Sequence, residues 1–289
     1  MEDLTKSDES EFAEEVFSFP PVRIAVVAHK ENDWFQESVA SFANLNYSDK
    51  QLIVLATGQT EWVEPIVSQY FPDADILEVD PEAGLGANFN EVLNSPDEPA
   101  FYLFCHHDVA LAPDALRLMV EESYRSNAAV VGPKVVNWER PNELLDVGKG
   151  MNRFAVTVQR VEAGEIDQEQ FDSVEQVFAV SNTAFLVRSD LFKALGGFDE
   201  AMGMFGEDLD FCWRAQIAGG TIMIVPGAVA RHRDESGEYQ TNPKRSRLME
   251  RHRLRSILSN YGKVKVLPML LLNLLISTLK GILLSLIHI

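Results

Sequence analysis

The chain has 289 residues, of which 46% are hydrophobic and 24% are charged, and its formal net charge is −19. A chain of this composition buries a large core, and this length fits one large α/β domain or two halves that share a sheet. Nucleic acid is excluded as a partner, because binding its phosphates needs a basic surface. Two cysteines, Cys105 and Cys212, cannot make a disulfide framework and indicate a reducing compartment.

The first half of the chain alternates between predicted strands and helices. Residues 1–20 form a largely acidic segment without an apolar period, which predicts a disordered tail and no signal peptide. Asn32 or Asp33 can then cap a helix. Such alternation is typical of a mainly parallel, doubly wound sheet, in which ligands bind beyond the carboxyl ends of the strands. The predicted strands of this half are Arg23–His29, Gln51–Gly58, Ala74–Val79 and Ala100–Cys105.

The second half contains a polar insertion and further regular elements. Asn137–Asp172 has few periodic apolar residues and is predicted to form long loops or a small insertion. Val177–Arg188 predicts one strand or a bent pair. Ser189 is expected to cap a helix that Gly196–Gly197 closes.

A helix is predicted in GEDLDFCWRAQIAGG, which begins at Gly206. Its residues Leu209, Trp213 and Ile217 recur at helical spacing and should share one face. The glycine pair at the end of this motif predicts the C-terminal end of the helix, and Thr221–Pro226 is predicted to form the strand that follows.

The first turn of this helix carries the acids that could act as a general base. Glu207 and Asp208 lie where the helix dipole favours carboxylates and keeps them ionised, as a base that takes a proton must be. Simple charge complementarity with the dipole is the alternative. Asp210 has its own explanation in an i,i+4 ion pair with Arg214, so Asp208 is the candidate base.

A second polar group follows the fourth predicted strand. In CHHDVALAPDAL, Asp108 comes just after the buried strand, beside His106 and His107. An acid placed there can hold a divalent cation together with a diphosphate, and nearby histidines favour manganese over magnesium. The alternative is a turn or helix-cap aspartate with surface histidines. His232, again directly after a strand, could complete the metal ligands from the other half.

The loop EAGLGANFN is a weaker candidate for ligand binding. Gly84 and Gly86 would let the backbone approach a ligand, with Asn88 or Asn90 as hydrogen-bond donors. The third glycine of the dinucleotide fingerprint is missing.

The C-terminal residues, 244–289, indicate a membrane-associated segment. Eight basic residues between Lys244 and Lys265 face one acid, Glu250, and the chain from Val266 onward is almost entirely apolar. About 20 apolar residues can cross a bilayer, but Lys280 is costly in the middle of such a span. Both a spanning helix and an interfacial helix therefore remain open, and so does a helix packed on its own domain. The basic run predicts that the preceding domain lies at the cytoplasmic face of the cell membrane.

Taken in this order, the motifs resemble family 2 glycosyltransferases of the GT-A fold. The resemblance runs from Val22 to Glu235 and is strongest at HHDVALAPDAL, at LFKALGGFDEAM and at GEDLDFCWRAQIAGG with the downstream ARHRD. It implies an α/β, Rossmann-like fold with a nucleotide-sugar-binding half (21–135) and an acceptor-binding, catalytic half (136–243). The basic segment and apolar tail are similar to members that build bacterial cell-envelope polysaccharides.

The resemblance also implies roles for individual residues. The family's central motif is Asp-x-Asp, whose last acid binds the metal; here Asp108 remains, and His106 and His232 are the further candidate ligands for Mn²⁺ or Mg²⁺. The intact Glu207–Asp208 pair implies Asp208 as the base. The donor would be a nucleotide diphospho-sugar. Its candidate contacts are Ala28, His29, Thr57, Gly58, Gly84, Asn90, His107 and Asp108.

The implied reaction is inverting sugar transfer to a cell-envelope glycan or a lipid-linked acceptor. One departure concerns the nucleobase, because the family's acid after the second strand, which contacts the base region, falls at Ala56. Two rival functions remain. A sugar-nucleotide nucleotidyltransferase should carry a glycine-rich, basic loop after the first strand, and AHKENDW lacks those glycines. A catalytically silent nucleotide-sugar-binding module is suggested by Ala56 and His106.

Overall fold

A computed structural model describes residues 19–29, 31–58, 60–152, 155–234, 243–262, 264, 266–272, 274–275 and 278–279. Almost all of the predicted acidic tail lies outside the described residues, and so do residues 280–289 at the end of the predicted apolar segment.

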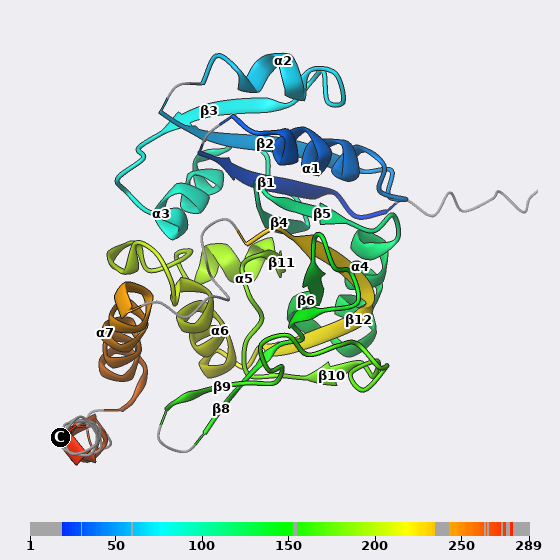
Figure 1. The fold of residues 1–289 in the computed structure, drawn as a ribbon. Helices are drawn as coiled ribbons and strands as arrows, with labels where there is room; N and C mark the ends of the chain where they lie inside the picture. The colour runs from blue at the N-terminus through cyan, green and yellow to red at the C-terminus, as the bar shows by residue number, and fades with distance from the viewer. Residues whose placement is uncertain are drawn as a thin grey trace, which may run out of the picture.

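One large sheet runs through the described part of the chain (Figure 1). Its main strands follow one another in the spatial order β10-β12-β6-β11-β4-β1-β2-β3, and β5 and β7 pair with β12 and β6. The bounds are β1 Val22–Ala28, β2 Lys50–Thr57, β3 Asp75–Val79, β4 Phe101–His106, β5 Val109–Leu111, β6 Ala128–Asn137, β7 Leu144–Asp146, β10 Glu175–Gln176, β11 Ala184–Arg188 and β12 Thr221–His232.

The sheet is mainly parallel, as the sequence predicts. β1 pairs in parallel with β2 and β4, β2 pairs in parallel with β3, and β12 pairs in parallel with β6, whereas β11 is antiparallel to both of its neighbours. β1 and β4 are buried along their whole length, which matches their continuous apolar runs. The register sets Ala28 opposite Ala56 and Val27 opposite His106, so the ends of β1, β2 and β4 meet at one edge.

Helices cover the sheet and carry the later motifs. Asn32 caps the first helix, since its side-chain oxygen accepts a hydrogen bond from the backbone N–H of Phe35 at 2.8 Å. The predicted insertion contains β7 and a separate hairpin of β8 (Lys149–Met151) and β9 (Thr157–Gln159). The helices are α1 Asp33–Ala43, α2 Val63–Val67, α3 Leu85–Asn90, α4 Ala115–Ser126, α5 Ser189–Ala194, α6 Glu207–Ile217 and α7 Pro243–Asn260, with 3₁₀ turns at Glu91–Asn94 and Glu200–Met202.

The structure corrects two local predictions and qualifies a third. In Val177–Arg188, the part that pairs in the sheet as β11 begins at Ala184. Ser189 is the first residue of α5 rather than its cap, and its hydroxyl donates instead to the carbonyl of Pro99. Ile217 keeps the predicted helical spacing with the buried Leu209 and Trp213, but it is 60% exposed because it is the last residue of α6.

A cluster of phenylalanine rings joins the sheet to α6. The rings of Phe104 on β4 and Phe198 lie 5.3 Å apart, and Phe198 lies 5.4 Å from Phe211 on α6. Phe192 on α5 contacts all three, with centroid separations of 4.9–5.3 Å. These four side chains are almost fully buried. The cluster therefore fixes where the first turn of α6 sits relative to the sheet edge.

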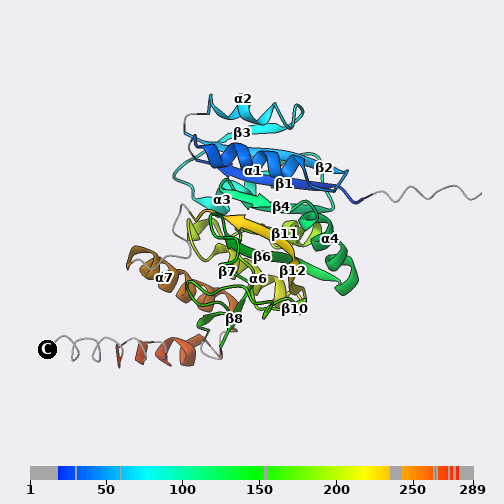
Figure 2. The same cartoon turned by 45° about the vertical axis from the view of Figure 1, so that its right-hand side comes forward.

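The predicted C-terminal membrane segment is helical where it is described. Residues 264, 266–272, 274–275 and 278–279 are helical, and they lie beyond α7 in both views (Figures 1 and 2). Met269 and Leu270 pack near Trp213 and Ile257, while several other apolar side chains of the segment are exposed. Among the described residues, no helix is both long enough and apolar enough to cross a membrane.

The phenylalanine cluster leads to a stability prediction. Phe211→Ala should lower the free energy of unfolding by about 3–5 kcal/mol, because it opens a cavity in a fully buried aromatic cluster. Ile217→Ala, at the exposed end of the same helix, should change it by less than about 0.5 kcal/mol. Urea unfolding of both variants measures the difference. Equal effects of the two substitutions would show that the cluster does not anchor α6.

Candidate active site

Three side chains that follow or end two separate strands, β4 and β12, converge at the carboxyl edge of the sheet. His106 ends β4, Asp108 follows two residues later, and His232 ends β12. Asp108 Oδ1 lies 3.2 Å from His232 Nε2, and the rings of His106 and His232 lie 5.3 Å apart. One ligand atom from each of the three residues lies within 4.8 Å of the other two. The structure thus assembles the predicted metal ligands, and we call His106, Asp108 and His232 the His-Asp-His group.

The electrostatics of this group favour a bound cation. Burial by itself raises the pKa of the Asp108 carboxyl, but His232, with its charge and its hydrogen bond, and the nearby His106 and His107 hold that pKa well below its ordinary value. Asp108 is therefore a carboxylate at any physiological pH. Two imidazoles and one carboxylate suit Mn²⁺ and other first-row divalent ions. The donors present fit the metal that the resemblance implies.

An asparagine links this group to the first turn of α6. The amide nitrogen of Asn182 donates to Glu207 Oε1 at 2.8 Å, so its oxygen faces His106 Nε2 at 3.1 Å. An amide oxygen can only accept, and His106 Nε2 must therefore carry the proton. This leaves His106 Nδ1 as the nitrogen with a lone pair for a metal, held in orientation as ligating histidines commonly are. The sequence contains no motif that singled out Asn182.

Asp208 is held by a buried lysine that the sequence prediction missed. Lys149 Nζ lies 2.8 Å from Asp208 Oδ2 and 3.9 Å from Asp146 Oδ2, and the side chains of Lys149 and Asp208 are each 6% exposed. Asp208 Oδ1 accepts a hydrogen bond from the backbone N–H of Leu209 at 2.7 Å. Lys149 begins β8 in the polar insertion, where nothing in the local pattern distinguishes it from a surface lysine. Its contact with Asp208 fixes the position of that carboxylate.

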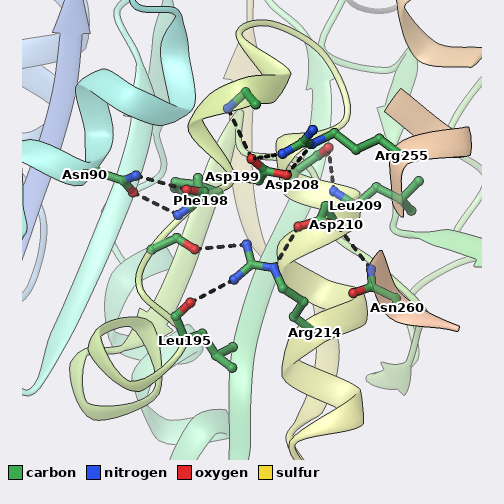
Figure 3. A network of polar contacts seen from close by, with 12 residues as sticks. Asn90, Leu195, Phe198, Asp199, Asp208, Leu209, Asp210, Arg214, Arg255 and Asn260 are labelled. Carbon is green, nitrogen blue, oxygen red and sulfur yellow. Dashed lines mark hydrogen bonds and ion pairs between the residues drawn. The ribbon is translucent and has the colours of Figure 1, made fainter. Parts of the chain in front are cut away.

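Asp210 has the structural role that its spacing predicts. Arg214 Nε binds Asp210 Oδ2 at 2.7 Å, and the same guanidinium donates to the carbonyls of Leu195 and Gly197 (Figure 3). Asn260 at the end of α7 donates to the other oxygen of Asp210 at 3.1 Å (Figure 3). Both oxygens of Asp210 therefore serve to join α6 to its neighbours.

The helix α7 is bonded to the loops around the site. Arg255 makes two contacts with Asp199 (Figure 3). The ring of His252 is buried, and its Nδ1 lies 2.5 Å from the carbonyl oxygen of Phe205, two residues before α6 begins. Phe205 has φ +68°, an unusual backbone conformation for a residue other than glycine. The bond from His252 helps to hold that turn, and with it the start of α6.

The glycine-bearing loop packs against the segment of the protein that precedes α6. Gly84 has φ +89°, and a Cβ there would lie 2.5 Å from the backbone of Gly203, whose carbonyl accepts from Leu85 N. Asn90 uses its amide oxygen for the N–H of Phe198 and its amide nitrogen for the carbonyl of Phe198 (Figure 3). The predicted ligand contacts Gly84 and Asn90 are therefore used to dock this loop onto the segments before α6.

The site opens into a cavity at the sheet edge. Its wall includes His29, His107, Asp108, Asn182, Glu207 and Asp208, with Lys149 among them. Met204 and Phe205, which precede α6, and Arg245 and Met249, which lie on α7, also line it. The cavity thus joins the His-Asp-His group to the acids of α6. Ala28, Thr57, Gly58, Gly84 and Asn90 are not among its lining residues, although Thr57 contacts His29.

Known proteins resemble this chain in both sequence and fold. A family model described as "Glycosyltransferase like family 2" matches residues 20–258. The pre-mycofactocin glycosyltransferase of Mycobacterium tuberculosis is 26% identical over 132 residues, which cover 46% of this chain and 26% of that protein. The match thus spans about a quarter of that relative's length.

Solved structures show the same fold at low sequence identity. GalNAc-T7, in a crystal structure with UDP, GalNAc and Mn²⁺, aligns with a TM-score of 0.60 and 11% identity over 74% of this chain and 44% of that one. S. aureus TarS 1–349 in complex with UDP aligns with a TM-score of 0.56 and 17% identity over 86% of this chain and 69% of that one.

The geometry of the His-Asp-His group predicts which histidines hold a metal. His232→Ala should weaken Mn²⁺ binding at least about tenfold, because it removes one of the three donors of the His-Asp-His group. His107→Ala, at the same cavity but outside the group, should leave the affinity within about threefold. Electron paramagnetic resonance of free Mn²⁺ in a titration gives both affinities. Similar losses in the two variants would place the metal elsewhere.

Proposed function

This chain belongs to glycosyltransferase-like family 2, and from that premise we propose that it transfers a sugar with inversion from a nucleotide diphospho-sugar to an acceptor hydroxyl. The GT-A fold agrees with the family. UDP in the TarS and GalNAc-T7 structures supports a nucleotide diphosphate as the leaving group.

One observation carries the proposal. Glu207 and Asp208 of α6 line the same cavity as His106 and Asp108 of the His-Asp-His group, and Asn182 bonds to both Glu207 and His106. The cavity thus offers cation ligands for a diphosphate and, beside them, an acid suited to an acceptor. A nucleotide-sugar-binding module without catalysis would not require the second feature.

In the proposed reaction Asp208 takes the proton from the acceptor hydroxyl as its oxygen attacks the anomeric carbon. Lys149 and the N–H of Leu209 hold the carboxylate in place for that step. Attack from the side of α6, opposite the leaving diphosphate, gives inversion. A divalent cation held by His106, Asp108 and His232 would offset the charge of the diphosphate. Glu207 accepts a hydrogen bond from the side-chain amide of Asn182. This bond positions the amide, whose oxygen in turn orients the ring of His106.

Family membership weighs against the nucleotidyltransferase alternative. A silent binding module is distinguished by turnover, because such a module would bind a nucleotide sugar without releasing nucleotide diphosphate. The acceptor proposed is a cell-envelope glycan or a lipid-linked sugar at the cytoplasmic face of the membrane. This rests on the exposed apolar residues of the C-terminal segment, among them Leu267, Leu271 and Leu274, which follow the basic helix α7.

Asp208→Asn should lower kcat for transfer about 10²–10⁴-fold, since loss of a general base typically costs this much. Nucleotide binding should stay within about threefold of the original. Asp210→Asn is the matched control on the same helix: its carboxylate is bound to Arg214 and Asn260, so it should lower the melting temperature and keep most of the activity of the folded enzyme. Steady-state release of nucleotide diphosphate and thermal unfolding measure the two effects. An Asp208→Asn enzyme with kcat near the original value would assign the base elsewhere.

The C-terminal segment should hold the protein on anionic vesicles. Each basic residue near such a surface contributes about 1 kcal/mol, whereas a fully buried leucine contributes about 1.5–3 kcal/mol, so high salt alone should not release the chain. A chain ending at Tyr261 should stay in solution, and the full chain with Leu267, Leu271 and Leu274 changed to Gln should bind more weakly. Flotation with phosphatidylglycerol-containing liposomes at low and high salt compares the three. A full chain that does not float at either salt concentration would contradict membrane association.

A further inference from the structure

A second hollow lies at the carboxyl edge of the sheet, beside the polar insertion. Asn137, the last residue of β6, and Arg233, directly after β12, both line it. Its volume is about 430 Å³, within the range of roughly 300–1,000 Å³ that small-molecule sites occupy. Two neighbouring hollows share lining residues with it, so the three form one groove along the insertion, which we call the insertion groove.

The insertion groove meets the active-site cavity. Arg245 of α7 lines both, and the backbone N–H of Arg233 donates to the carbonyl of Asp108 at 3.1 Å. The predicted nucleotide contacts lie at the ends of β1 and β2, and β4, which ends in His106, lies between β1 and β6 in the sheet. The groove therefore leads away from the cavity on the side opposite the predicted nucleotide contacts.

The outer wall of the groove is held firmly by bonds within the insertion. Backbone hydrogen bonds of 2.7 and 2.9 Å join segments 142–144 and 165–167. Lys134 on β6, whose side chain is 7% exposed, binds Asp167 at 2.7 Å and Asp172 at 2.5 Å. A wall that is already ordered loses little conformational freedom when a ligand binds.

The groove also contains an unusual backbone conformation. Asp234, two residues after His232, lines the groove with φ +62° and is 9% exposed. Positive φ is uncommon for residues other than glycine, and such residues cluster at ligand-binding sites. The position of Asp234 thus gives a second indication, independent of the shape of the groove, that a ligand binds here.

Opposite charges line the groove in equal number. Among the described lining residues, the three arginines and the three acids are Arg140, Arg233 and Arg245, and Glu143, Glu162 and Asp234. Arg140 binds Glu143 at 2.7 Å, and Arg233 binds Glu139. An anionic ligand would meet these carboxylates as well as the arginines. A hydroxyl group can donate to a carboxylate and accept from a guanidinium, so it is suited to both.

Amide and apolar groups complete the lining. Asn137 and Gln159 contribute side-chain amides, which can bond to hydroxyl groups in either sense. Leu145 and Val161 are half-buried and present apolar surface between the polar groups. The lining therefore suits a ligand that is uncharged, rich in hydroxyl groups and apolar on its ring faces.

We propose that the insertion groove binds an uncharged oligosaccharide, the part of the acceptor that extends away from the hydroxyl at Asp208. The inference rests on the proposed function and specifies its acceptor as a glycan of several sugars. A phosphate carried by a lipid directly beside the reacting sugar would instead place negative charge against Glu143 and Glu162.

The test measures how binding depends on the length and charge of a glycan. An array of uncharged and uronic-acid-containing hexose oligomers, from single hexoses to hexasaccharides, is probed with the labelled full chain and Mn²⁺. Binding of uncharged oligomers should strengthen at least about tenfold between the single hexose and the trisaccharide, a gain that one or two hydrogen bonds supply.

Two matched variants locate this gain in the groove. Ala163→Trp, at an exposed position of the groove wall, should reduce it to within about threefold, because the indole ring fills the groove. Ala218→Trp, exposed at the end of α6 and outside the groove, should leave it unchanged.

The outcomes separate this inference from the proposed function. No gain with length, or a gain that survives Ala163→Trp, overturns the groove as a glycan site, and preference for uronic-acid-containing oligomers overturns the ligand class. The proposed function is followed separately, as release of nucleotide diphosphate from UDP-hexoses and GDP-hexoses in the presence of the hexasaccharides. Absence of release contradicts the proposed function whatever the array shows, whereas release without a length gain contradicts the groove alone.

Discussion

Buried negative charge is the constraint on which this site depends. Five carboxylates at the sheet edge and along α6 are almost completely removed from water: Asp108, Asp146, Glu207, Asp208 and Asp210. A buried charge is costly unless it is paired or hydrogen-bonded. The structure meets this cost with Lys149 between Asp146 and Asp208, Arg214 on Asp210, Asn182 on Glu207 and His232 on Asp108. These partnerships fix the orientation of each acid and so define the chemistry available to it.

The hydrogen-bond and ion-pair partners of Asp108, Asp208 and Asp210 differ, and these differences indicate a different role for each acid. Asp210 does not line the cavity, and Arg214 and Asn260 bind its two oxygens, so it holds α6 in place. Imidazole groups pair with Asp108, and imidazole is also a metal ligand, so this acid suits a site whose charge is completed by a cation. Asp208 is oriented by Lys149 and lines the cavity, which is the position that a base for an incoming hydroxyl requires. The phenylalanine cluster and α7 hold these parts together from outside the site.

The sequence predicted those parts of the fold and site whose signals are local. The apolar runs that became β1, β2 and β4, the Asn32 cap and the Asp210–Arg214 pair each follow from a spacing of a few residues. Metal ligands could be proposed as well, since His106 and Asp108 follow one strand and His232 another. Lys149, Asn182 and His252 were missed because their roles depend on partners 59, 25 and 47 residues away. Gly84 and Asn90 were predicted to contact a ligand. In the structure Gly84 packs against the backbone of Gly203 and Asn90 accepts a hydrogen bond from Phe198, contacts that cannot be predicted from the neighbouring residues in the sequence.

The central claim is that acceptor activation occurs from the α6 side of the cavity, opposite the leaving diphosphate. The most direct measurement is the configuration of the sugar released when water replaces the acceptor. Proton NMR of the anomeric signal, recorded before the free sugar equilibrates, should show the β anomer forming first from a UDP-α-hexose that the enzyme cleaves. An initial α anomer would show retention, and would contradict a single attack in which Asp208 is the base.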